Sequence, residues 1–220
     1  MEKKYISNED KTARMFESNF MEALSRVHPS VPVIMYLPLV LYLLYYSYIN
    51  PDIKYESIIL LFVLGTFVWT FTEYTLHRFI FHYVPNNSIG QRMHFIFHGV
   101  HHAYPKDSRR LVMPPSVSVP LAFTFYALFY YILGAKFVYP FFSGFLTGYL
   151  FYDMTHYAIH HFNIKSGLFL FIKKHHMRHH YKDATRGFGV SQPLWDIVYR
   201  TNFEAEKPAK VQKLRPGDHI

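Results

Sequence analysis

Four long apolar runs alternate with polar segments along this chain of 220 residues. At about 1.5 Å per residue, a helix of roughly twenty residues crosses the ~30 Å hydrocarbon core of a bilayer. A soluble protein with four buried helices is the alternative, but almost all of the remaining sequence is polar and rich in histidine. The pattern therefore predicts an all-α integral membrane protein with four transmembrane helices, at about residues 31–49, 57–76, 116–133 and 137–152.

The polar segments around these runs define the rest of the expected organisation. A polar N-terminal segment covers residues 1–30, and a membrane domain extends over residues 31–203. Two histidine-bearing stretches, residues 77–115 and 156–203, fall outside the runs and together predict a helical cap. From residue 204 to residue 220 the sequence is charged and contains two prolines, which predicts a flexible tail.

Lysine and arginine residues are distributed unevenly about the four runs. If both termini share one side of the membrane, 21 of the 23 basic residues lie on that side, and only Lys54 and Lys136 lie on the other. The positive-inside rule then places both termini and the histidine-rich cap in the cytosol. The formal net charge of +8 does not indicate a nucleic-acid partner, because the basic residues flank apolar runs instead of gathering on one soluble face.

Histidine is unusually abundant, with 15 residues, while cysteine is absent. Any metal would therefore be held by nitrogen and carboxylate ligands, never by sulfur. Ten imidazoles gathered in four groups on one side of a membrane predict metal binding. The groups are "HRFIFH" with His77 and His82, "HGVHH" with His98, His101 and His102, "HYAIHH" with His156 and His160, and "HHMRHH" with His176, His179 and His180.

The spacing within the groups indicates how the rings are presented. On a helix, residues i, i+3 and i+4 share one face, so each HxxHH group presents three imidazoles in one direction. His77 and His82 are five residues apart, which is about 140° around a regular helix. Either the second span ends or unwinds there, or the two rings point at different metal centres.

Ten nitrogen ligands exceed what one ion takes, and so they imply two ions. A structural zinc site normally has four ligands and a closed shell. Two ions with ten neutral ligands beneath an apolar membrane slot favour an oxygen-activating di-iron centre, although zinc outcompetes ferrous iron for nitrogen ligands and can occupy the purified protein. Glu73, Asp153 and Asp183 lie three or four residues from histidines of these groups, and we expect their carboxylates to accept imidazole N–H groups and orient the rings.

The order HxxxxH, HxxHH, HxxxHH and HxxHH resembles the fatty acid hydroxylase superfamily of membrane di-iron enzymes. The stretches "EYTLHRFIFH", "RRLVMPP", "YDMTHYAIHH" and "GFGVSQPLWDIVYRT" narrow the likeness to the fatty acid 2-hydroxylases that act on sphingolipid acyl chains. The likeness extends from about residue 73 to residue 201 and makes residues 31–203 a membrane hydroxylase domain. It implies metal ligation by the ten histidines named above and no ligand role for His94, His161 and His175.

The resemblance also implies an activity, which is O2-dependent 2-hydroxylation of long-chain fatty acyl groups held in the apolar slot. The cofactors implied are two iron ions, O2 and an external electron donor. Because no haem-binding motif of the cytochrome b type precedes the first span, we expect a separate electron-transfer protein of the cytochrome b or ferredoxin type. We expect the chain itself to lie in a bacterial inner membrane or in the endoplasmic reticulum. Arg109 and Arg110 are candidates for holding a carboxylate or lipid headgroup, although a solvated pair of cations fits the sequence equally well.

Two other functions remain compatible with the sequence. The same cofactor serves sterol, carotenoid and sphingoid-base hydroxylases and desaturases, which share the histidine motifs. A non-enzymatic membrane zinc-binding protein is the second alternative, and it would lose its fold, not a product, when stripped of metal. Metal transport is disfavoured because the four runs contain a single charged residue, Glu73, near the end of the second run.

Overall fold

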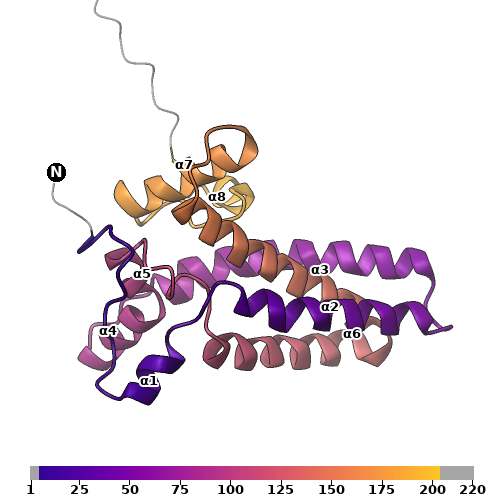
Figure 1. Cartoon of the computed structure of the whole chain (residues 1–220). Coiled ribbons are helices and arrows are strands. Elements are labelled where there is room, and N and C mark those ends of the chain that lie inside the picture. The colour runs from indigo at the N-terminus through magenta and orange to yellow at the C-terminus, as the bar shows by residue number, and fades with distance from the viewer. Residues whose placement is uncertain (1–4, 204–220) are drawn as a thin grey trace, which may run out of the picture.

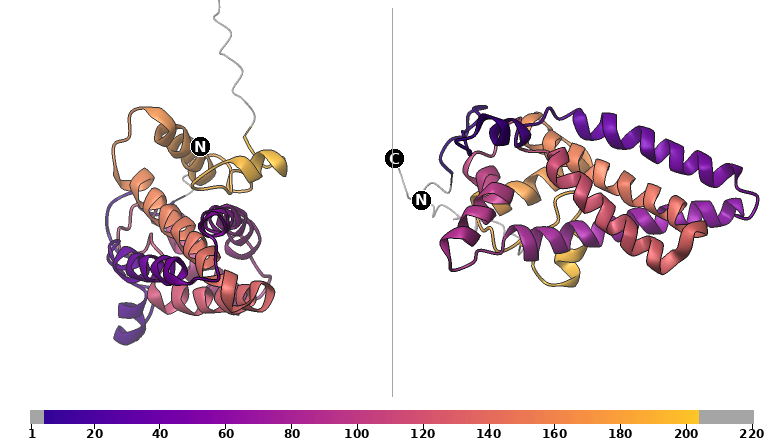
Figure 2. Two further views of the ribbon diagram at one scale, coloured as in Figure 1. Left: turned by 90° about the vertical axis from the view of Figure 1, so that its right-hand side faces the viewer. Right: turned by 90° about the horizontal axis from the view of Figure 1, so that it is seen from below.

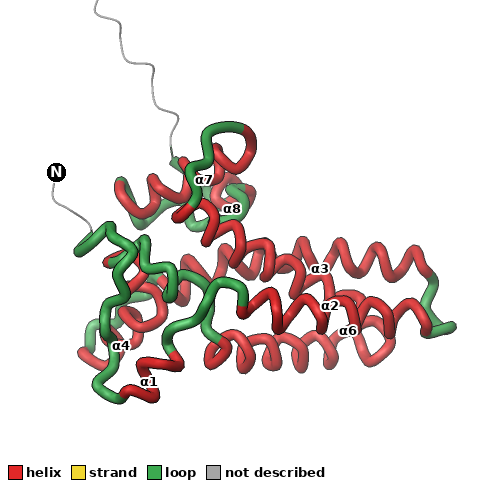
Figure 3. Tube along the Cα trace, in the orientation of Figure 1, coloured by secondary structure: helices red, strands yellow, loops and turns green. Residues whose placement is uncertain are grey.

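The computed structural model describes residues 5–203, which fold into helices joined by loops (Figure 3). No strand is present among these residues, which confirms the all-α class. The predicted tail, residues 204–220, lies outside the described residues. Within the described part of the chain, three helices are long and apolar enough to cross a membrane: α2, Val31–Ile49; α3, Tyr55–Thr75, which continues into the π-helix η1, Leu76–Phe81; and α6, Pro115–His161.

The helix α6 is broken at Gly134 into two arms. The backbone of Gly134 has φ 71° and ψ 170°, a conformation that glycine adopts without steric penalty. The chain therefore runs out along the bundle and returns beside itself (Figure 1 and Figure 2). Aromatic rings join the arms, with the ring centroids of Phe129 and Phe141 4.8 Å apart. The two arms correspond to the third and fourth predicted spans, and a separate crossing of the bilayer by each arm stays a prediction.

The helix α3 and the second arm of α6 pack at very close range. A Cβ atom on Gly65 would lie 1.9 Å from the carbonyl oxygen of Phe141, and a Cβ atom on Gly144 would lie 1.9 Å from that of Phe62. Glycine at both positions lets the two backbones approach, as small residues do between transmembrane helices. The hydroxyl of Thr66 also donates to the carbonyl oxygen of Gly144 at 3.0 Å. This contact fixes the arm that carries the third histidine group against α3.

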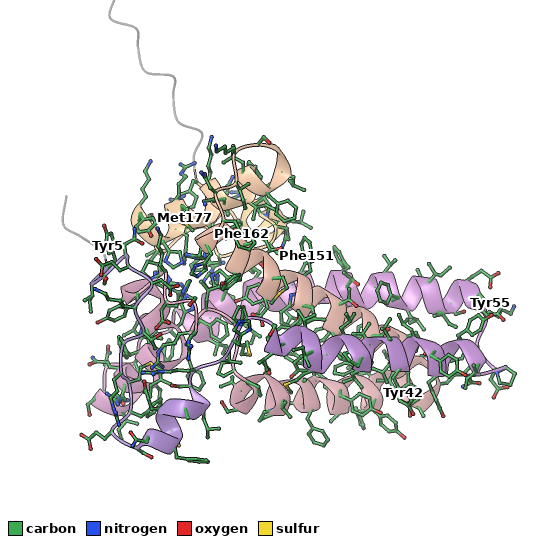
Figure 4. All side chains as sticks on the ribbon, viewed as in Figure 1. Tyr5, Tyr42, Tyr55, Phe151, Phe162 and Met177 are labelled. Atoms are coloured by element: carbon green, nitrogen blue, oxygen red, sulfur yellow. The ribbon has the colours of Figure 1, made fainter. Side chains whose placement is uncertain are left out.

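The bundle turns apolar side chains outward along its length. Ile34, Ile59 and Phe123 are each at least 65% exposed, which suits contact with lipid tails. Tyr55 lies at the end of the bundle away from the cap, and Tyr42 projects from its flank (Figure 4). Other exposed tyrosines of the long helices are Tyr45, Tyr46, Tyr48, Tyr130 and Tyr131. Tyrosine in such numbers is typical of residues at a membrane–water interface.

A cap of short elements covers one end of the bundle (Figure 1). Three parts of the chain form the cap: the segment before α2, the segment between α3 and α6, and the segment after α6. The cytosolic location of the cap stays a prediction. Its elements are α1, Asn19–Leu24; α4, Ser88–His94; the π-helix η2, Phe95–Gly99; α5, Val100–Ala103; α7, Gly167–Tyr181; and α8, Leu194–Val198.

Candidate metal centre

Ten buried or half-buried histidines converge where the cap meets the bundle, and they form two clusters of five. Within each cluster the ligand atoms lie within 4.8 Å of one another. Nitrogen atoms crowd this region in Figure 4, near the labelled Met177 of α7. Cluster 1 contains His77, His82, His98, His102 and His179, and cluster 2 contains His101, His156, His160, His176 and His180. The structure thus brings together all ten histidines predicted from the sequence.

Each HxxHH group is divided between the two clusters. His98 and His102 belong to cluster 1, whereas His101 between them belongs to cluster 2. The rings of His102 and His180, one from each cluster, stack with centroids 4.2 Å apart. The rings of a group are therefore close together, as the helical spacing predicts, but they serve two adjacent centres. On α7 the division is reversed, with His176 and His180 in cluster 2 and His179 in cluster 1.

The five-residue spacing of His77 and His82 is accommodated by the π-helix η1. The N–H of His82 donates to the carbonyl oxygen of His77 at 3.2 Å. This bond between residues five apart is the one that defines a π-helix. It places both rings on one side, with their Nε2 atoms 3.2 Å apart. Of the two alternatives that the sequence leaves open, the structure shows the unwound helix, with both rings in cluster 1.

Within each cluster the Nε2 atoms face one another without enough protons to pair them. The Nε2 of His98 lies 3.0 Å from that of His77, 3.1 Å from that of His82 and 3.0 Å from that of His102. A neutral imidazole carries at most one proton on this atom. Converging nitrogen atoms of this kind are the arrangement in which imidazoles could hold a metal ion.

Backbone carbonyls fix which ring nitrogen carries the proton. The Nδ1 of His77 lies 2.5 Å from the carbonyl oxygen of Phe188, and the Nδ1 of His179 lies 2.7 Å from that of Arg186. Because a carbonyl only accepts, the proton is on Nδ1 and the Nε2 lone pair is left for a metal. Burial lowers the pKa of His179 to about 4 and that of His180 well below the ordinary value. The rings are therefore neutral at pH 7, which is the form that binds metals.

The distances between neighbouring nitrogens also indicate a coordination number. Contacting Nε2 atoms are 3.0–3.2 Å apart in cluster 1 and 2.9–3.1 Å apart in cluster 2. Two nitrogens about 2.1 Å from one ion are about 3.0 Å apart at a right angle and about 3.4 Å apart at the tetrahedral angle. The contacting pairs are closer than in a tetrahedral site, and the five histidines of each cluster exceed the four ligands of a structural zinc site.

Glu73 does not contact an imidazole directly but holds the backbone of the loop whose carbonyl contacts His77. Its carboxylate accepts hydrogen bonds from the backbone N–H groups of Val190 at 2.7 Å and Ser191 at 2.8 Å. Two residues earlier, the carbonyl oxygen of Phe188 holds His77. The expected bond between this carboxylate and an imidazole is thus replaced by a brace on the backbone that orients the ring.

The other two predicted carboxylates have different surroundings. Asp183 accepts from the backbone N–H of Thr185 at 2.9 Å, in the turn that presents the carbonyl of Arg186 to cluster 1. Asp153 is fully buried and accepts from the N–H of Met113 at 3.4 Å. It lines a pocket beside the clusters. Their predicted roles as direct partners of imidazoles stay predictions.

Asp196 is a buried carboxylate that no motif in the sequence singles out as functional. It accepts from the N–H groups of Phe188 at 2.9 Å and Gly189 at 2.7 Å, and from the hydroxyl of Thr201 at 2.7 Å. Its other neighbour is His175, whose Nε2 lies 3.1 Å from the carboxylate and belongs to neither cluster. The signal in the sequence was its place in the quoted "GFGVSQPLWDIVYRT" stretch. Asp196 therefore shapes the loop that positions cluster 1.

The two arginines proposed for a headgroup are in different environments. The Arg110 side chain is 2% exposed, donates to the carboxylate of Glu22 at 2.6 Å and lies 3.4 Å from that of Asp107. Arg109 is exposed, and its carbonyl oxygen accepts from the N–H of Val27 at 2.9 Å. The guanidinium of Arg110 is thus engaged inside the cap, and a headgroup role for either arginine stays a prediction.

An apolar pocket of about 330 Å³ adjoins both clusters. His98 of cluster 1 and His101 and His156 of cluster 2 line it, together with Tyr152 and Asp153. The remaining wall is mainly aliphatic and aromatic, and most of it comes from the N-terminal segment, η2, and the loop 110–114 with the first turn of α6. An alkyl chain in this pocket would have carbon atoms next to the imidazoles of both clusters.

Comparison with known proteins agrees with this geometry. A family model described as fatty acid hydroxylase matches residues 62–201. A dihydroceramide fatty acyl 2-hydroxylase of Arabidopsis thaliana is 38% identical over 200 residues, which cover 90% of this chain and 84% of that protein. The fatty acid 2-hydroxylase of Rattus norvegicus is 40% identical over 221 residues, but the chain spans only 59% of its length. The solved structure of full-length scs7p, in which only the hydroxylase domain is visible, matches with a TM-score of 0.79 and 39% identity over 86% of this chain and 72% of that one.

Proposed function

This chain belongs to the fatty acid hydroxylase family, and we propose that it is a membrane monooxygenase that hydroxylates carbon 2 of a long-chain fatty acyl group of a sphingolipid. The observation that carries the proposal is the pocket, which is apolar along its walls and lined by histidines of both clusters. The names of the relatives, a dihydroceramide fatty acyl 2-hydroxylase and a fatty acid 2-hydroxylase, support the choice of carbon and of lipid.

We further propose iron as the metal, with one ion in each five-histidine cluster and the ten histidines as ligands. Iron ions held by these histidines would supply, together with O2, the oxidising power to break an unactivated C–H bond, which acid–base side chains do not have. The neutral imidazoles suit iron, and they also suit zinc, so purified protein can carry either. Glu73, Asp183 and Asp196 support the clusters by holding the loops whose carbonyls orient His77 and His179.

The reaction needs electrons from outside the chain. One atom of O2 enters the C–H bond at carbon 2 and the other leaves as water, which consumes two electrons and two protons. A separate electron-transfer protein of the cytochrome b or ferredoxin type would supply them. Sterol, carotenoid and sphingoid-base products remain alternatives that use the same electrons and the same clusters.

The contribution of the pocket is position and exclusion of water. The buried side chains of Leu111, Val112 and Val100 line it, so an acyl chain displaces little ordered water there. The Asp153 carboxylate has acceptor capacity beyond its long bond from Met113. We propose that it accepts a hydrogen bond from the amide or a hydroxyl of the substrate, which sets the carbon atom that lies beside the histidines.

We propose four spans, with each arm of α6 crossing the bilayer and with both termini and both clusters in the cytosol. The distribution of lysine and arginine supports this orientation. The turn at Gly134 and the loop after α2 both lie at the end away from the cap, next to Lys136 and Lys54 (Figure 1). A bacterial inner membrane and the endoplasmic reticulum both meet these requirements.

The proposal is tested by mass spectrometry of total acyl chains from a host that makes no 2-hydroxy acids. The protein is expressed with a reductase and a ceramide supply, beside a His176→Ala variant and, as a matched control, His161→Ala, which alters a histidine outside both clusters. We expect 2-hydroxyacyl chains with the wild type and the control only. If the oxygenated product is a sterol, a carotenoid or a sphingoid base, the proposed substrate is wrong and that lipid takes its place. If the protein holds metal but no lipid is oxygenated, the enzymatic function is wrong and the protein only binds metal.

A further inference from the structure

The N-terminal segment forms one wall of the pocket that adjoins the two clusters. Met15 and Phe16 precede α1, Met21 and Leu24 lie on it, and Ser25 follows it. All five line the pocket. The sequence predicts only a polar segment at this place, so the apolar side chains that it contributes to the pocket are a finding of the structure.

A buried carboxylate, Glu22, holds this wall in place. Its Oε2 accepts the backbone N–H groups of Met15 at 2.9 Å and Phe16 at 3.1 Å. Its Oε1 accepts from the guanidinium of Arg110 at 2.6 Å, and Arg26 pairs with the same oxygen. The side chains of Arg110 and Glu22 are 2% and 7% exposed. Removal of either partner would leave a buried charge with only its weaker counter-charge, Asp107 for Arg110 or the partly exposed Arg26 for Glu22, so the pair holds the segment in one position.

Two further contacts tie the segment to the rest of the cap. Arg110 also donates to the carbonyl oxygen of Ala13 at 2.5 Å. From the other side, Arg92 of α4 donates to the carbonyl oxygen of Met15 at 2.6 Å. Residues 13–25, which we call the strap, are therefore fastened across the pocket by two arginines from different parts of the chain.

The outer edge of the strap is apolar and lies where the long helices begin. Phe20 is 71% exposed, and Met21 and Leu24 are also exposed. Exposed Met93 and Phe97, from α4 and η2, line the same pocket as the strap. The strap leads into α2, and its last turn contacts the first turn of α6. The rim of the pocket is thus continuous with the apolar surface of two helices that are long enough to cross a membrane.

We propose that the strap is part of the substrate site: the acyl chain enters from the lipid between the strap and η2, and Met15 and Phe16 contact it inside the pocket. The inference rests on the proposed hydroxylase function and names the bilayer as the source of the substrate. Glu22 and Arg110 are positioning residues that act through the strap.

Photo-crosslinking tests this contact directly. The full-length protein is placed in lipid nanodiscs with a ceramide that carries a diazirine in its acyl chain. Trypsin cleaves after Arg14 and Arg26, so most of the strap is released as one peptide, residues 15–26. We expect label on this peptide that excess unmodified ceramide suppresses, whereas label on the outward faces of α2 and α3 persists. The inference would be overturned if the peptide carried no label, or if excess ceramide left its label unchanged.

A pair of variants tests the positioning role. Glu22→Gln removes the buried charge, and Glu17→Gln removes an exposed charge from the same segment. We expect Glu22→Gln to raise the KM for ceramide roughly tenfold, with kcat and metal content close to wild type, because the loss of one charged hydrogen-bonding partner loosens the wall without touching a cluster. Glu17→Gln should match the wild type. A KM for Glu22→Gln equal to that of Glu17→Gln would contradict this role.

A third variant keeps the test decisive if Glu22→Gln loses metal through misfolding. Phe16→Ala enlarges the pocket within the strap, and we expect it to shift the products toward bulkier or longer acyl chains. An unchanged chain-length distribution would refute the contact. A protein that hydroxylates no lipid but still shows ceramide-suppressed label on residues 15–26 would refute the proposed function and leave the strap assignment standing.

Discussion

Removal of one histidine should weaken the binding of one metal ion and spare the other. The structure divides the fourth histidine group between clusters, so His176 and His179, three residues apart on α7, belong to different clusters and, in the proposed centre, to different ions. His179 and His77 are distant in sequence but share cluster 1. The effect of paired substitutions should therefore follow the clusters and not the sequence.

The size of the effect follows from the ligand count. Structural zinc sites with four ligands bind with about 10–16 kcal/mol at pH 7, which is about 3 kcal/mol per ligand. At 1.4 kcal/mol for each factor of ten, the loss of one ligand weakens one ion by roughly 100-fold. The five-histidine clusters offer four remaining ligands, so the weakened ion should still bind at low chelator concentration.

Chelator titration of the purified protein, with metal counted by mass spectrometry, measures this directly. For His77→Ala, His176→Ala and His179→Ala, we expect one ion to be released at a lower chelator concentration than in the wild type. The second ion should be released at the same chelator concentration as in the wild type. The double variant of His77 and His179 should keep one ion, and that of His176 and His179 should release both early. The reverse result for the two double variants would refute the division into clusters, and His161→Ala should behave as wild type.

Three other changes have expected outcomes. Glu73→Ala leaves two buried N–H groups of the Val190–Ser191 loop unpaired, so cluster 1 should lose about 10- to 100-fold in metal affinity while cluster 2 changes little; equal loss at both would contradict the brace. Gly144→Val places a side chain where a Cβ meets a carbonyl oxygen at 1.9 Å, so it should lower the free energy of unfolding by about 3 kcal/mol. Ala127→Val, on the exposed face of the same helix, should leave the free energy of unfolding close to that of the wild type. Asp153→Asn should raise the KM for ceramide or move the site of hydroxylation with metal content unchanged, and unchanged kinetics would argue against a substrate contact.

The apolar runs and the histidine groups could be predicted from sequence because each depends on local pattern. The first run coincides with α2, Val31–Ile49, and the second differs from α3 by a residue or two at each end. The break at Gly134 falls in the short interval between the third and fourth runs. Continuous apolar runs of about twenty residues indicate such helices without any knowledge of tertiary contacts.

The division of the histidines into clusters could not be predicted, because it depends on backbone irregularity and on distant loops. A regular helix would separate His77 from His82, and only the π-helix brings them together. The carbonyl that holds His77 comes from Phe188, more than a hundred residues later. No spacing rule connects such positions.

The carboxylates and arginines show the same limit. Sequence proximity suggested that Glu73 would contact an imidazole, but its hydrogen bonds go to a loop near the end of the described chain. Arg110 is adjacent to Arg109 in a basic pair, yet its guanidinium is buried against Glu22 because the N-terminal segment folds back over the cap. Such long-range pairing of charges is invisible in a single sequence.

The most direct test of the proposed function uses oxygen-18. The purified, iron-loaded protein is reconstituted in a bilayer with ceramide, an electron-transfer protein and labelled O2, beside the His176→Ala variant. We expect one oxygen-18 atom at carbon 2 of the acyl chain with the wild type and none with the variant. Label at another carbon, label derived from water, or no oxygenated ceramide from protein that holds two reduced iron ions would contradict it.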